Sequence, residues 1–281
     1  MKHYDLHSHS TASDGSLTPA QLINLAKESG VDCLALTDHD GIDGIEEAKL
    51  QAKSINLEFI PGIELSVTWG NFTIHIVGLN INTDYAPLLA GTHQLKLYRL
   101  WRAQQISKGL EEFGIKGALS GAQKFSNGKM IGRMHFANFL VANGNCKDVR
   151  TVFKKFLVKN KPGYVHGQWA SLEDVISWIT GAGGVAVIAH PGRYPFKNKK
   201  LKMLLYEFIE LGGKAIEVVS GSHSIQEVAR MTSIAREFEL YASMGSDFHN
   251  PDASWNKLGK LTPLPEQCTP VWKAWEPNLE Y

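Results

Sequence analysis

Nine side chains of metal-binding type are spread along this chain of 281 residues, and nearly every one stands where a short apolar run ends. The nine are His7, His9, Asp14, His39, Glu64, His75, His190, Asp247 and His249. Short apolar runs of this kind are typical of buried strands. The chain is therefore expected to adopt a fold that brings the ends of its strands together.

The spacing of these residues supports a shared site. His7 and His9 are two residues apart, and so are Asp247 and His249 near the other end of the chain. An extended chain places positions two apart on one face, so each pair can bind one ion together. His75 alternates with the isoleucines on either side of it, which predicts that it points away from them.

The ligand types indicate the chemistry. A single histidine beside an apolar run is usually an ordinary core or surface residue. A set of imidazoles and carboxylates without cysteine is typical of Mn, Fe or Zn that is held for hydrolysis, because open positions remain for water and substrate. The recurrence of paired ligands at both ends of the chain favours a multinuclear metal site, and the protein is interpreted as a hydrolase.

The pattern of strands and helices predicts an α/β barrel. Helices are expected after Thr18-Pro19, with Gly30 at the end, and after the capping box that starts at Ser224 and opens a helix through about Phe238. Repeated βα units whose strand ends carry functional residues are typical of a barrel. Seven strands are predicted near residues 3–8, 32–37, 57–67, 72–79, 184–189, 214–219 and 241–246.

One segment interrupts this pattern. Residues 92–163 lack strand runs and are predicted to form a mainly helical insertion, between a first barrel part at 1–91 and a second at 164–281. The insertion holds 14 Lys and Arg residues against 3 Asp and Glu residues, whereas the rest of the chain holds 15 against 25. Such an imbalance favours a polyanionic partner over a merely solvated basic face.

Two sets of side chains in the insertion bear on that interpretation. Lysines that could contact a nucleic-acid strand are Lys124, Lys129, Lys154 and Lys155. Aromatic residues interleaved with the basic residues of the insertion include Trp101, Phe125, Phe136 and Phe139. Since aromatic residues at helical spacing are commonly part of a core, the aromatic set is interpreted as packing and the lysines as the candidate contacts.

The cysteine content and the N-terminus bear on location. The three cysteines form no CxxC motif, so no disulfide framework is predicted. The N-terminus leads directly into a predicted strand without an apolar signal core, and no apolar run approaches the roughly 18 residues of a membrane span. These features predict a cytoplasmic protein without a membrane partner.

The motifs together resemble those of the PHP (polymerase and histidinol phosphatase) phosphoesterases. The resemblance spans essentially the whole chain, and within the family it is to the YciV/TrpH group, which carries an insertion at this point. Its members include 5′-3′ exoribonucleases and nucleoside 3′,5′-bisphosphate phosphatases. The motifs are His7-Ser8-His9, Asp14-Gly15, Thr37-Asp38-His39-Asp40, Pro61-Gly62-Ile63-Glu64, His75, His190-Pro191-Gly192, Asp247-Phe248-His249 and Ile131-Gly132-Arg133-Met134-His135.

The resemblance implies a distorted (β/α)7 barrel that holds three divalent ions, usually manganese, with zinc or iron as the other options. Adjacent ions can activate a bridging hydroxide, so no protein nucleophile is required. The resemblance implies three ligand groups: His7, His9, Glu64 and Asp247 for one ion; Glu64, His75 and His190 for a second; Asp14, His39 and His249 for a third.

Substrate recognition requires further groups. Arg133 lies in the basic insertion, and Arg193 follows His190-Pro191-Gly192 at the expected mouth of the barrel. Guanidinium groups match phosphate oxygens, so both are predicted to bind the 5′-phosphate of a nucleotide, assisted by His135. The alternative for Arg193 is an ion pair with a nearby acid.

One chemical event then covers both activities of the group, namely cleavage at the phosphorus on the 3′-oxygen of a nucleotide that is held by its 5′-phosphate. The expected substrates are 5′-phosphorylated RNA, short oligonucleotides and nucleoside 3′,5′-bisphosphates. Two other classes stay open: a small-molecule phosphatase such as histidinol phosphate phosphatase, and a non-catalytic nucleic-acid-binding module.

Overall fold

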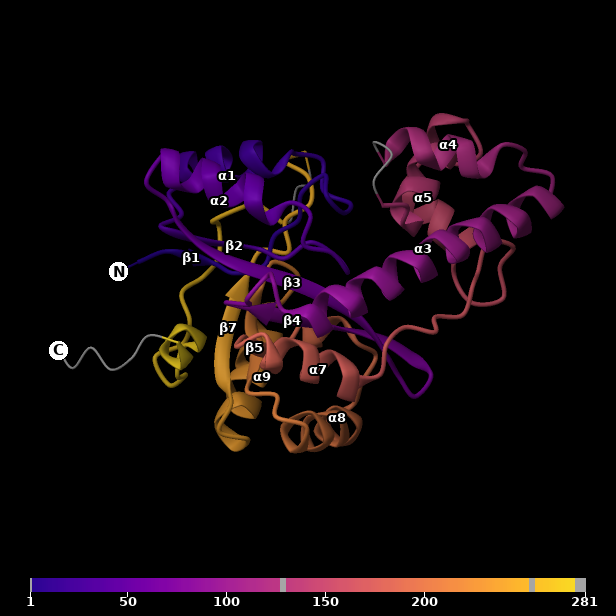
Figure 1. The fold of residues 1–281 in the computed structure, drawn as a ribbon. Helices are drawn as coiled ribbons and strands as arrows, with labels where there is room; N and C mark the ends of the chain where they lie inside the picture. The colour runs from indigo at the N-terminus through magenta and orange to yellow at the C-terminus, as the bar shows by residue number, and fades with distance from the viewer. Residues whose placement is uncertain (1, 127–129, 253–255, 276–281) are drawn as a thin grey trace.

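The strands form one curved sheet that almost closes into a barrel. A computed structural model describes residues 2–126, 130–252 and 256–275 of the chain. Within these residues seven strands lie in the order of the sequence, from β1 to β7 (Figure 1). The strands are β1 (Tyr4–Asp5), β2 (Cys33–Leu36), β3 (Glu58–Trp69), β4 (Phe72–Leu79), β5 (Val185–Ile188), β6 (Ala215–Ser220) and β7 (Tyr241–Gly245). All seven coincide with predicted strands.

The first and last strands meet at the closure of the barrel. The amide of Leu6 donates to the carbonyl of Met244 at 3.0 Å, and the amide of Asp247 donates to the carbonyl of His7 at 2.9 Å. Ser8 forms an isolated parallel bridge with Phe248. The two predicted ligand pairs, although they are at opposite ends of the chain, therefore follow neighbouring strands.

Two connections depart from the predicted series of βα units. β3 and β4 pair antiparallel, from Gly62 with Leu79 to Trp69 with Phe72, and β4 pairs antiparallel with β5. Only two residues join β3 to β4, which suits a hairpin, whereas a parallel crossover needs about a dozen residues or more. The remaining neighbours are parallel, so the sheet is mixed.

Helices cover the outside of the sheet. The caps predicted for two of them are confirmed: Thr18 and Ser224 each form a capping box. The α-helices are α1 (Pro19–Glu28), α2 (Ile45–Ser54), α3 (Ala86–Glu112), α4 (Ala118–Phe125), α5 (Arg133–Ala142), α6 (Val149–Val152), α7 (Leu172–Gly181), α8 (Asn198–Glu210) and α9 (Ile225–Glu237). Shorter turns are a π-helix at Phe153–Leu157 and 3₁₀ turns at Pro191–Arg193 and Val271–Ala274.

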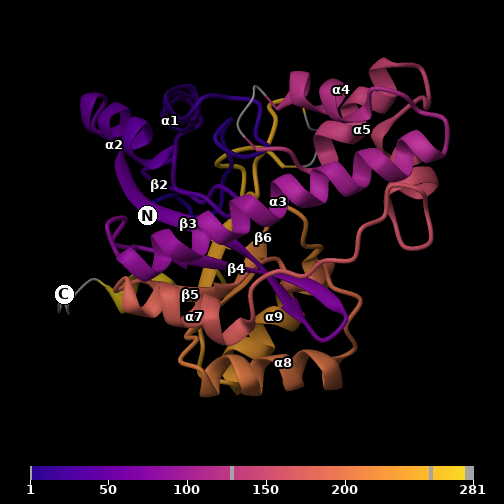
Figure 2. The same cartoon turned by 45° about the vertical axis from the view of Figure 1, so that its right-hand side comes forward.

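The predicted insertion corresponds to a helical lobe with a hydrophobic core of its own. Figures 1 and 2 show α4 and α5 beside the far end of α3, away from the helices that cover the barrel. The residues that pack in this second core run from Ala103 to Leu157. The predicted boundary at residue 92 lies inside α3, because this helix contributes Leu88 and Leu95 to the barrel core and continues into the lobe. The division into three parts stays a prediction.

The aromatic residues of the lobe divide between core and surface. Phe136 is fully buried, whereas Trp101 and Phe125 are exposed. Phe139 is partly buried and packs against the second core. Interpretation of the set as core therefore holds for Phe136 and Phe139 but is wrong for Trp101 and Phe125.

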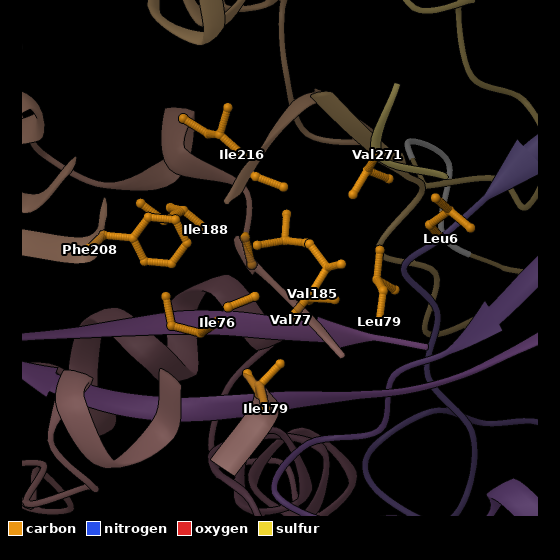
Figure 3. Close-up of a cluster of buried hydrophobic side chains, with 14 of the residues drawn as sticks. Leu6, Ile76, Val77, Leu79, Ile179, Val185, Ile188, Phe208, Ile216 and Val271 are labelled. Carbon is orange, nitrogen blue, oxygen red and sulfur yellow. The ribbon is translucent and has the colours of Figure 1, made fainter. Parts of the chain in front are cut away.

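The main core lies between the sheet and the helices α7, α8 and α9. Figure 3 shows apolar side chains from several strands, such as Ile76, Val185 and Ile216, together with Ile179 of α7 and Phe208 of α8. This packing is typical of strands that are buried on both faces, and it fixes the positions of the strand ends that carry the predicted ligands. In the described part of the chain, no helix has both the length and the apolar character that crossing a bilayer requires.

Candidate metal centre and phosphate site

The nine predicted ligands converge on one end of the barrel. Three groups of them bring their ligand atoms within 4.8 Å of one another: His9, Asp14, His39 and His249; His7, His9 and Glu64; His39, Glu64 and His75. His190 and Asp247 join these groups through contacts with Glu64 and His9. The groups share members, so they form one continuous cluster.

Glu64 occupies the middle of this cluster. Its carboxylate is fully buried at the point where β3 passes the loop after β2, and its backbone forms a parallel bridge with His39. Five histidine nitrogens surround its two oxygens. The distances to Oε1 are 2.9 Å from His75 Nδ1, 3.0 Å from His190 Nε2 and 3.4 Å from His7 Nε2; those to Oε2 are 2.8 Å from His39 Nδ1 and 3.4 Å from His9 Nε2.

The two aspartates extend the cluster on either side of His249. Asp247 Oδ1 lies 3.2 Å from His9 Nε2 and 3.6 Å from His249 Nδ1. Asp14 Oδ1 lies 3.2 Å from His249 Nε2 and 3.8 Å from His39 Nε2. These two carboxylates, with that of Glu64, bring strong oxygen ligands to every part of the histidine cluster.

The polar atoms of this cluster fit metal ions better than they fit one another. Several buried nitrogen and oxygen atoms of these residues have no hydrogen-bond partner among the described residues: His9 Nδ1, Asp14 Oδ1, His39 Nδ1, Glu64 Oε2 and His190 Nδ1. His39 Nδ1 and Glu64 Oε2 are only 2.8 Å apart but are not aligned for a hydrogen bond. Buried polar groups without partners are costly, so such a set is suited to bind cations.

The electrostatics of the cluster keep its carboxylates ionised. Burial opposes the ionisation of Glu64, but the charges of His75 and His39 outweigh it and hold the pKa of Glu64 well below its usual range. Burial opposes the ionisation of Asp247 too, and the charges of His7 and His249 keep its pKa well below the usual range. Ionised carboxylates are the form that binds a metal.

The pKa values of the histidines are shifted in different directions. Burial, followed by repulsion from His249 and His39, lowers the pKa of His9 to about 3. This ring is therefore neutral at physiological pH, with a lone pair available for a metal. Burial also opposes protonation of His249, but Asp14 and Asp247 outweigh it and raise its pKa to about 10. A metal at this position would have to displace a proton from His249.

The backbone is specialised where the ligands leave the strands. His190 has a φ of 29° and Asp247 a φ of 55°, both in the left-handed region that non-glycine residues rarely adopt. Such conformations cluster at functional sites, where the surrounding structure determines them. Gly245 lies against His7: a Cβ atom on this glycine would be 2.2 Å from His7 Cβ. Close approach of β7 to His7 therefore requires glycine at this position.

Glu217 supports two of the predicted ligands and was not identified from the sequence. It lies in β6 and is fully buried. Its Oε1 accepts from His7 Nδ1 at 2.6 Å, and its Oε2 accepts from the amide of His190 at 2.5 Å. The first bond points His7 Nε2 toward the cluster. Burial opposes protonation of His7, but the charges of Glu217 and Glu64 outweigh it and raise its pKa well above the usual range, so a metal at Nε2 would displace a proton. A carboxylate that orients a ligand histidine in this way also increases the basicity of the ring.

Substitution of Glu217 by glutamine is expected to lower metal affinity or turnover about 10- to 100-fold. Glutamine keeps the size of the side chain but removes the charge that orients His7. Metal content after dialysis and turnover across a metal titration measure the effect, and excess metal should restore part of the activity. The exposed Glu210→Gln is the matched control. Wild-type metal affinity in Glu217→Gln would show that this carboxylate has no positioning role.

Two further aspartates in the motifs hold loops rather than metal. Asp38 accepts from the amide and hydroxyl of Ser10 and from the hydroxyl of Ser13, which fixes the loop that carries Asp14. Asp40 accepts from the amide of Ser66 at 2.6 Å and from Arg99 Nε at 2.7 Å. The second pair links α3 directly to the loop after His39.

Arg102 and Arg133 lie close to Arg99, which pairs with Asp40. Arg102 is buried, lies 5.3 Å from the Trp169 ring and makes only a 3.5 Å contact with the carbonyl of Val165; its Nε has no hydrogen-bond partner. Burial and the nearby charges of Arg133 and Arg99 lower the pKa of Arg102 to about 10. Among the described residues no acid forms an ion pair with Arg102 or Arg133, which makes this cluster suitable for an anion.

Arg133 and His135 lie together at the start of α5. Reduced solvation and the charge of Arg99 lower the pKa of Arg133, whose guanidinium is 5.6 Å from the Phe153 ring. His135 Nδ1 accepts from the amide of Gly132 at 3.0 Å. This bond leaves Nε2 as the protonated nitrogen of the neutral ring, and burial lowers the pKa of His135. His135 can therefore donate a hydrogen bond to an anion without carrying a charge.

Arg193 does not join this cluster. Its Nη1 forms an ion pair with Asp247 Oδ2 at 2.5 Å, and about half of its side chain is exposed. The structure thus places Arg193 at the mouth of the barrel, as predicted, but with an acidic partner. Arg102 was missed from the sequence. The available signal was its position: Leu95, Arg99, Arg102 and Ile106 share the buried face of α3.

Comparisons with known proteins agree with this geometry. The model of the PHP domain family matches residues 5–167. A 3′,5′-nucleoside bisphosphate phosphatase of Chromobacterium violaceum is 46% identical over 99% of this chain and 98% of its own length. The 5′-3′ exoribonuclease Rnm of Escherichia coli is 44% identical over 97% of this chain and 94% of its own. The chain belongs to the PHP family.

Solved structures share the fold. The structure of an amidohydrolase from Chromobacterium violaceum, with bound sulfate and no metal, has a TM-score of 0.93 at 46% identity and covers 97% of this chain and 95% of its own. A protein from Bifidobacterium adolescentis, assigned as a metal-dependent phosphoesterase, has a TM-score of 0.79 at 26% identity. The match covers 96% of this chain and 93% of that protein. The protein is thus an enzyme of the phosphoesterase class, and the non-catalytic alternative is set aside.

Proposed function

We propose that this enzyme hydrolyses the phosphate ester on the 3′-oxygen of a nucleotide that it holds by its 5′-phosphate. The observation that carries the proposal is the combination of a cluster of nine candidate ligands with two arginines, Arg102 and Arg133, that pair with no acid among the described residues. Arg99 joins the two, because it pairs with Asp40 beside His39 and lies over the same Trp169 ring as Arg102, at 4.9 Å. A nucleoside 3′,5′-bisphosphate and the first nucleotide of a 5′-phosphorylated RNA each carry a phosphate at both the 5′- and the 3′-oxygen, as this arrangement requires.

The resident metals are three divalent ions, with manganese proposed and zinc or iron as the other options. The residues that would hold these ions are the three ligand groups implied by the family resemblance, and Glu64 belongs to two of these groups. When bound, these ions supply a nucleophile from water and neutralise charge on the attacking and leaving oxygens. The protein supplies the ionised carboxylates of Glu64, Asp14 and Asp247, the neutral ring of His9 and the orientation of His7 by Glu217.

The terminal phosphate is assigned to Arg102, Arg133 and His135. Guanidinium groups donate in a fork that matches a phosphate, and the Nε of Arg102 is free to do so. Arg193 has a different role in this scheme: it neutralises Asp247 through Nη1 at the edge of the metal centre, and its remaining N–H donors lie at that edge and not beside Arg102 and Arg133. The pocket is therefore built by α3 and α5 and not by the loop after β5.

Both activities of the named relatives fit this geometry. Release of the 3′-phosphate from a nucleoside 3′,5′-bisphosphate and removal of the first nucleotide from a 5′-phosphorylated RNA break the same kind of bond. In both cases the 3′-oxygen of the held nucleotide is the leaving group. In the second case the attacked phosphorus stays on the rest of the strand, which thereby regains a 5′-phosphate. We assign both reactions to one site, with 5′-phosphorylated RNA, short oligonucleotides and bisphosphates as substrates.

The test compares three substrates under one set of conditions with added manganese. A nucleoside 3′,5′-bisphosphate and a 5′-phosphorylated oligoribonucleotide should both be hydrolysed, the latter with release of 5′-mononucleotides. Histidinol phosphate, which carries one phosphate and no nucleotide, should be hydrolysed poorly. Efficient turnover of histidinol phosphate alone would favour the small-molecule phosphatase and contradict the proposal.

Neutralising exposed lysines of the lobe should separate long RNA from small substrates. Lys124, Lys154 and Lys155 are exposed, whereas Lys129 lies outside the described residues. The triple change to glutamine is expected to weaken RNA binding and to reduce the slope of log affinity against log salt by about one or less per lost phosphate contact. Hydrolysis of the bisphosphate should change little. No loss on RNA would mean that the strand does not cross these lysines.

A further inference from the structure

We infer that a cavity between the barrel and the helical lobe binds the base of the nucleotide whose ester is cleaved. This inference rests on the proposed function and adds to it the part of the substrate that lies between the two phosphate sites. The cavity has a volume of about 380 Å³, which is enough for a nucleobase and part of its ribose. Its lining includes His39 of the metal centre and Arg99 beside the arginine cluster, so it lies between the two sites.

The apolar part of the lining comes from three separate segments. Leu100 of α3 and Ala12 of the loop before α1 contribute to it, and so do Met130 and Ile131, which precede α5. Leu100 is 50% exposed and Met130 is partly exposed, whereas Ile131 beside them is only 8% exposed. A flat ring placed against Leu100 and Met130 would cover this exposed surface, which is favourable in water.

The charged part of the lining is already neutralised. Asp40 pairs with Arg99, and Asp43 at the rim pairs with Lys96 Nζ at 2.6 Å. Among the described residues of its lining, the cavity therefore offers no unpaired arginine or lysine of the kind that Arg102 and Arg133 provide next to it. A phosphate is better held by the arginines, and an uncharged aromatic ring by the cavity.

This chemistry also predicts how bases are distinguished. Contacts that are mainly apolar discriminate by buried area and not by hydrogen-bond pattern, so their selectivity is low. All four bases should be accepted, and purines should be favoured over pyrimidines by about tenfold or less because their rings are larger. An enzyme that removes nucleotides one after another from mixed sequences requires this tolerance.

The decisive experiment compares Leu100→Ser with Leu97→Ser on two substrates. Leu97 lies on the same helix, is 54% exposed and does not line the cavity, so its variant is the matched control. The substrates are adenosine 3′,5′-bisphosphate and an abasic ribose 3′,5′-bisphosphate. Leu100→Ser should lower kcat/KM about tenfold for the first and leave it unchanged for the second. Leu97→Ser should change neither, and circular dichroism should show both variants folded.

Several outcomes would overturn the inference. Equal losses on both substrates would mean that Leu100 acts on the site as a whole. A loss only on a dinucleotide, with the bisphosphate unaffected, would place the base of the leaving nucleotide in the cavity. Equal wild-type rates on the adenine and abasic substrates would remove the base from the cavity while leaving the proposed phosphoesterase function intact. The proposed function itself fails if the wild type hydrolyses neither.

Discussion

Replacing Asp247 with asparagine is expected to lower hydrolysis by at least about a thousandfold, while the protein stays folded. The buried carboxylate contacts His9 and His249 within the cluster and carries a full negative charge there. Asparagine keeps its shape but removes this charge, so the metal centre loses a strong ligand. The fold rests on apolar strands and should persist. Turnover, metal content and circular dichroism of the purified variant measure the three effects.

The exposed Asp252→Asn, five residues further along the same loop, is the control and should behave as the wild type. His7→Ala should reproduce the loss, because His7 belongs to the same cluster and is oriented by Glu217. Turnover at the wild-type level in Asp247→Asn or His7→Ala, with metal still bound, would contradict the assignment of these residues. Loss of secondary structure in Asp247→Asn would instead show that the carboxylate is needed for folding.

Substituting Arg102 with glutamine is expected to remove the preference for a 5′-phosphate. Wild-type enzyme should cut RNA that carries a 5′-hydroxyl about a hundredfold more slowly than the 5′-phosphorylated form, because the buried guanidinium would be left without an anion. In Arg102→Gln and Arg133→Gln the rate on 5′-phosphorylated RNA should fall to near that on 5′-hydroxyl RNA, which should barely change. Rates on the two RNAs with all three enzymes provide the measurement.

The exposed Arg150→Gln of α6 is the matched control, since it removes a charge from the same lobe outside the cluster. Arg193→Gln separates the two candidate phosphate sites. Because Arg193 pairs with Asp247 at the metal centre, this change should affect both RNAs alike. If instead Arg193→Gln alone abolishes the preference for a 5′-phosphate, the terminal phosphate belongs at the mouth of the barrel and not between α3 and α5.

The strands and the positions of the predicted ligands could both be predicted from the same pattern of apolar runs that end in polar residues. Buried strands are short apolar runs, and polar residues at their ends face the same edge of the sheet, so the positions of His7 and His190 could be inferred without coordinates. The hairpin between β3 and β4 was less obvious, since its long strands resemble the other runs. The two-residue link at Gly70 was the local signal, and Gly70 has a φ of 56°.

Residues that act through another side chain were harder to predict. Glu217 is the one charged residue in the run from Ala215 to Ser220, and a buried carboxylate needs a partner. The sequence can indicate this need but not that His7, 210 residues away, satisfies it. The partners of Arg193 and Arg102 depend similarly on tertiary contacts. The position of an arginine in the sequence does not show whether its guanidinium pairs with an acid, packs against an aromatic ring or has no partner.

Helix α3 belongs to two hydrophobic cores, which makes its rotation and its register matter as much as its composition. Leu95 packs in the barrel core and Ile106 in that of the lobe, and Arg99 and Arg102 lie between them. One residue added between these anchors would turn everything beyond it by about 100° and shift it by about 1.5 Å. Such an insertion would leave every arginine in the sequence and yet direct the wrong side chains at the substrate. The distance between the metal centre and the arginines is therefore set by one continuous helix and not by a loop.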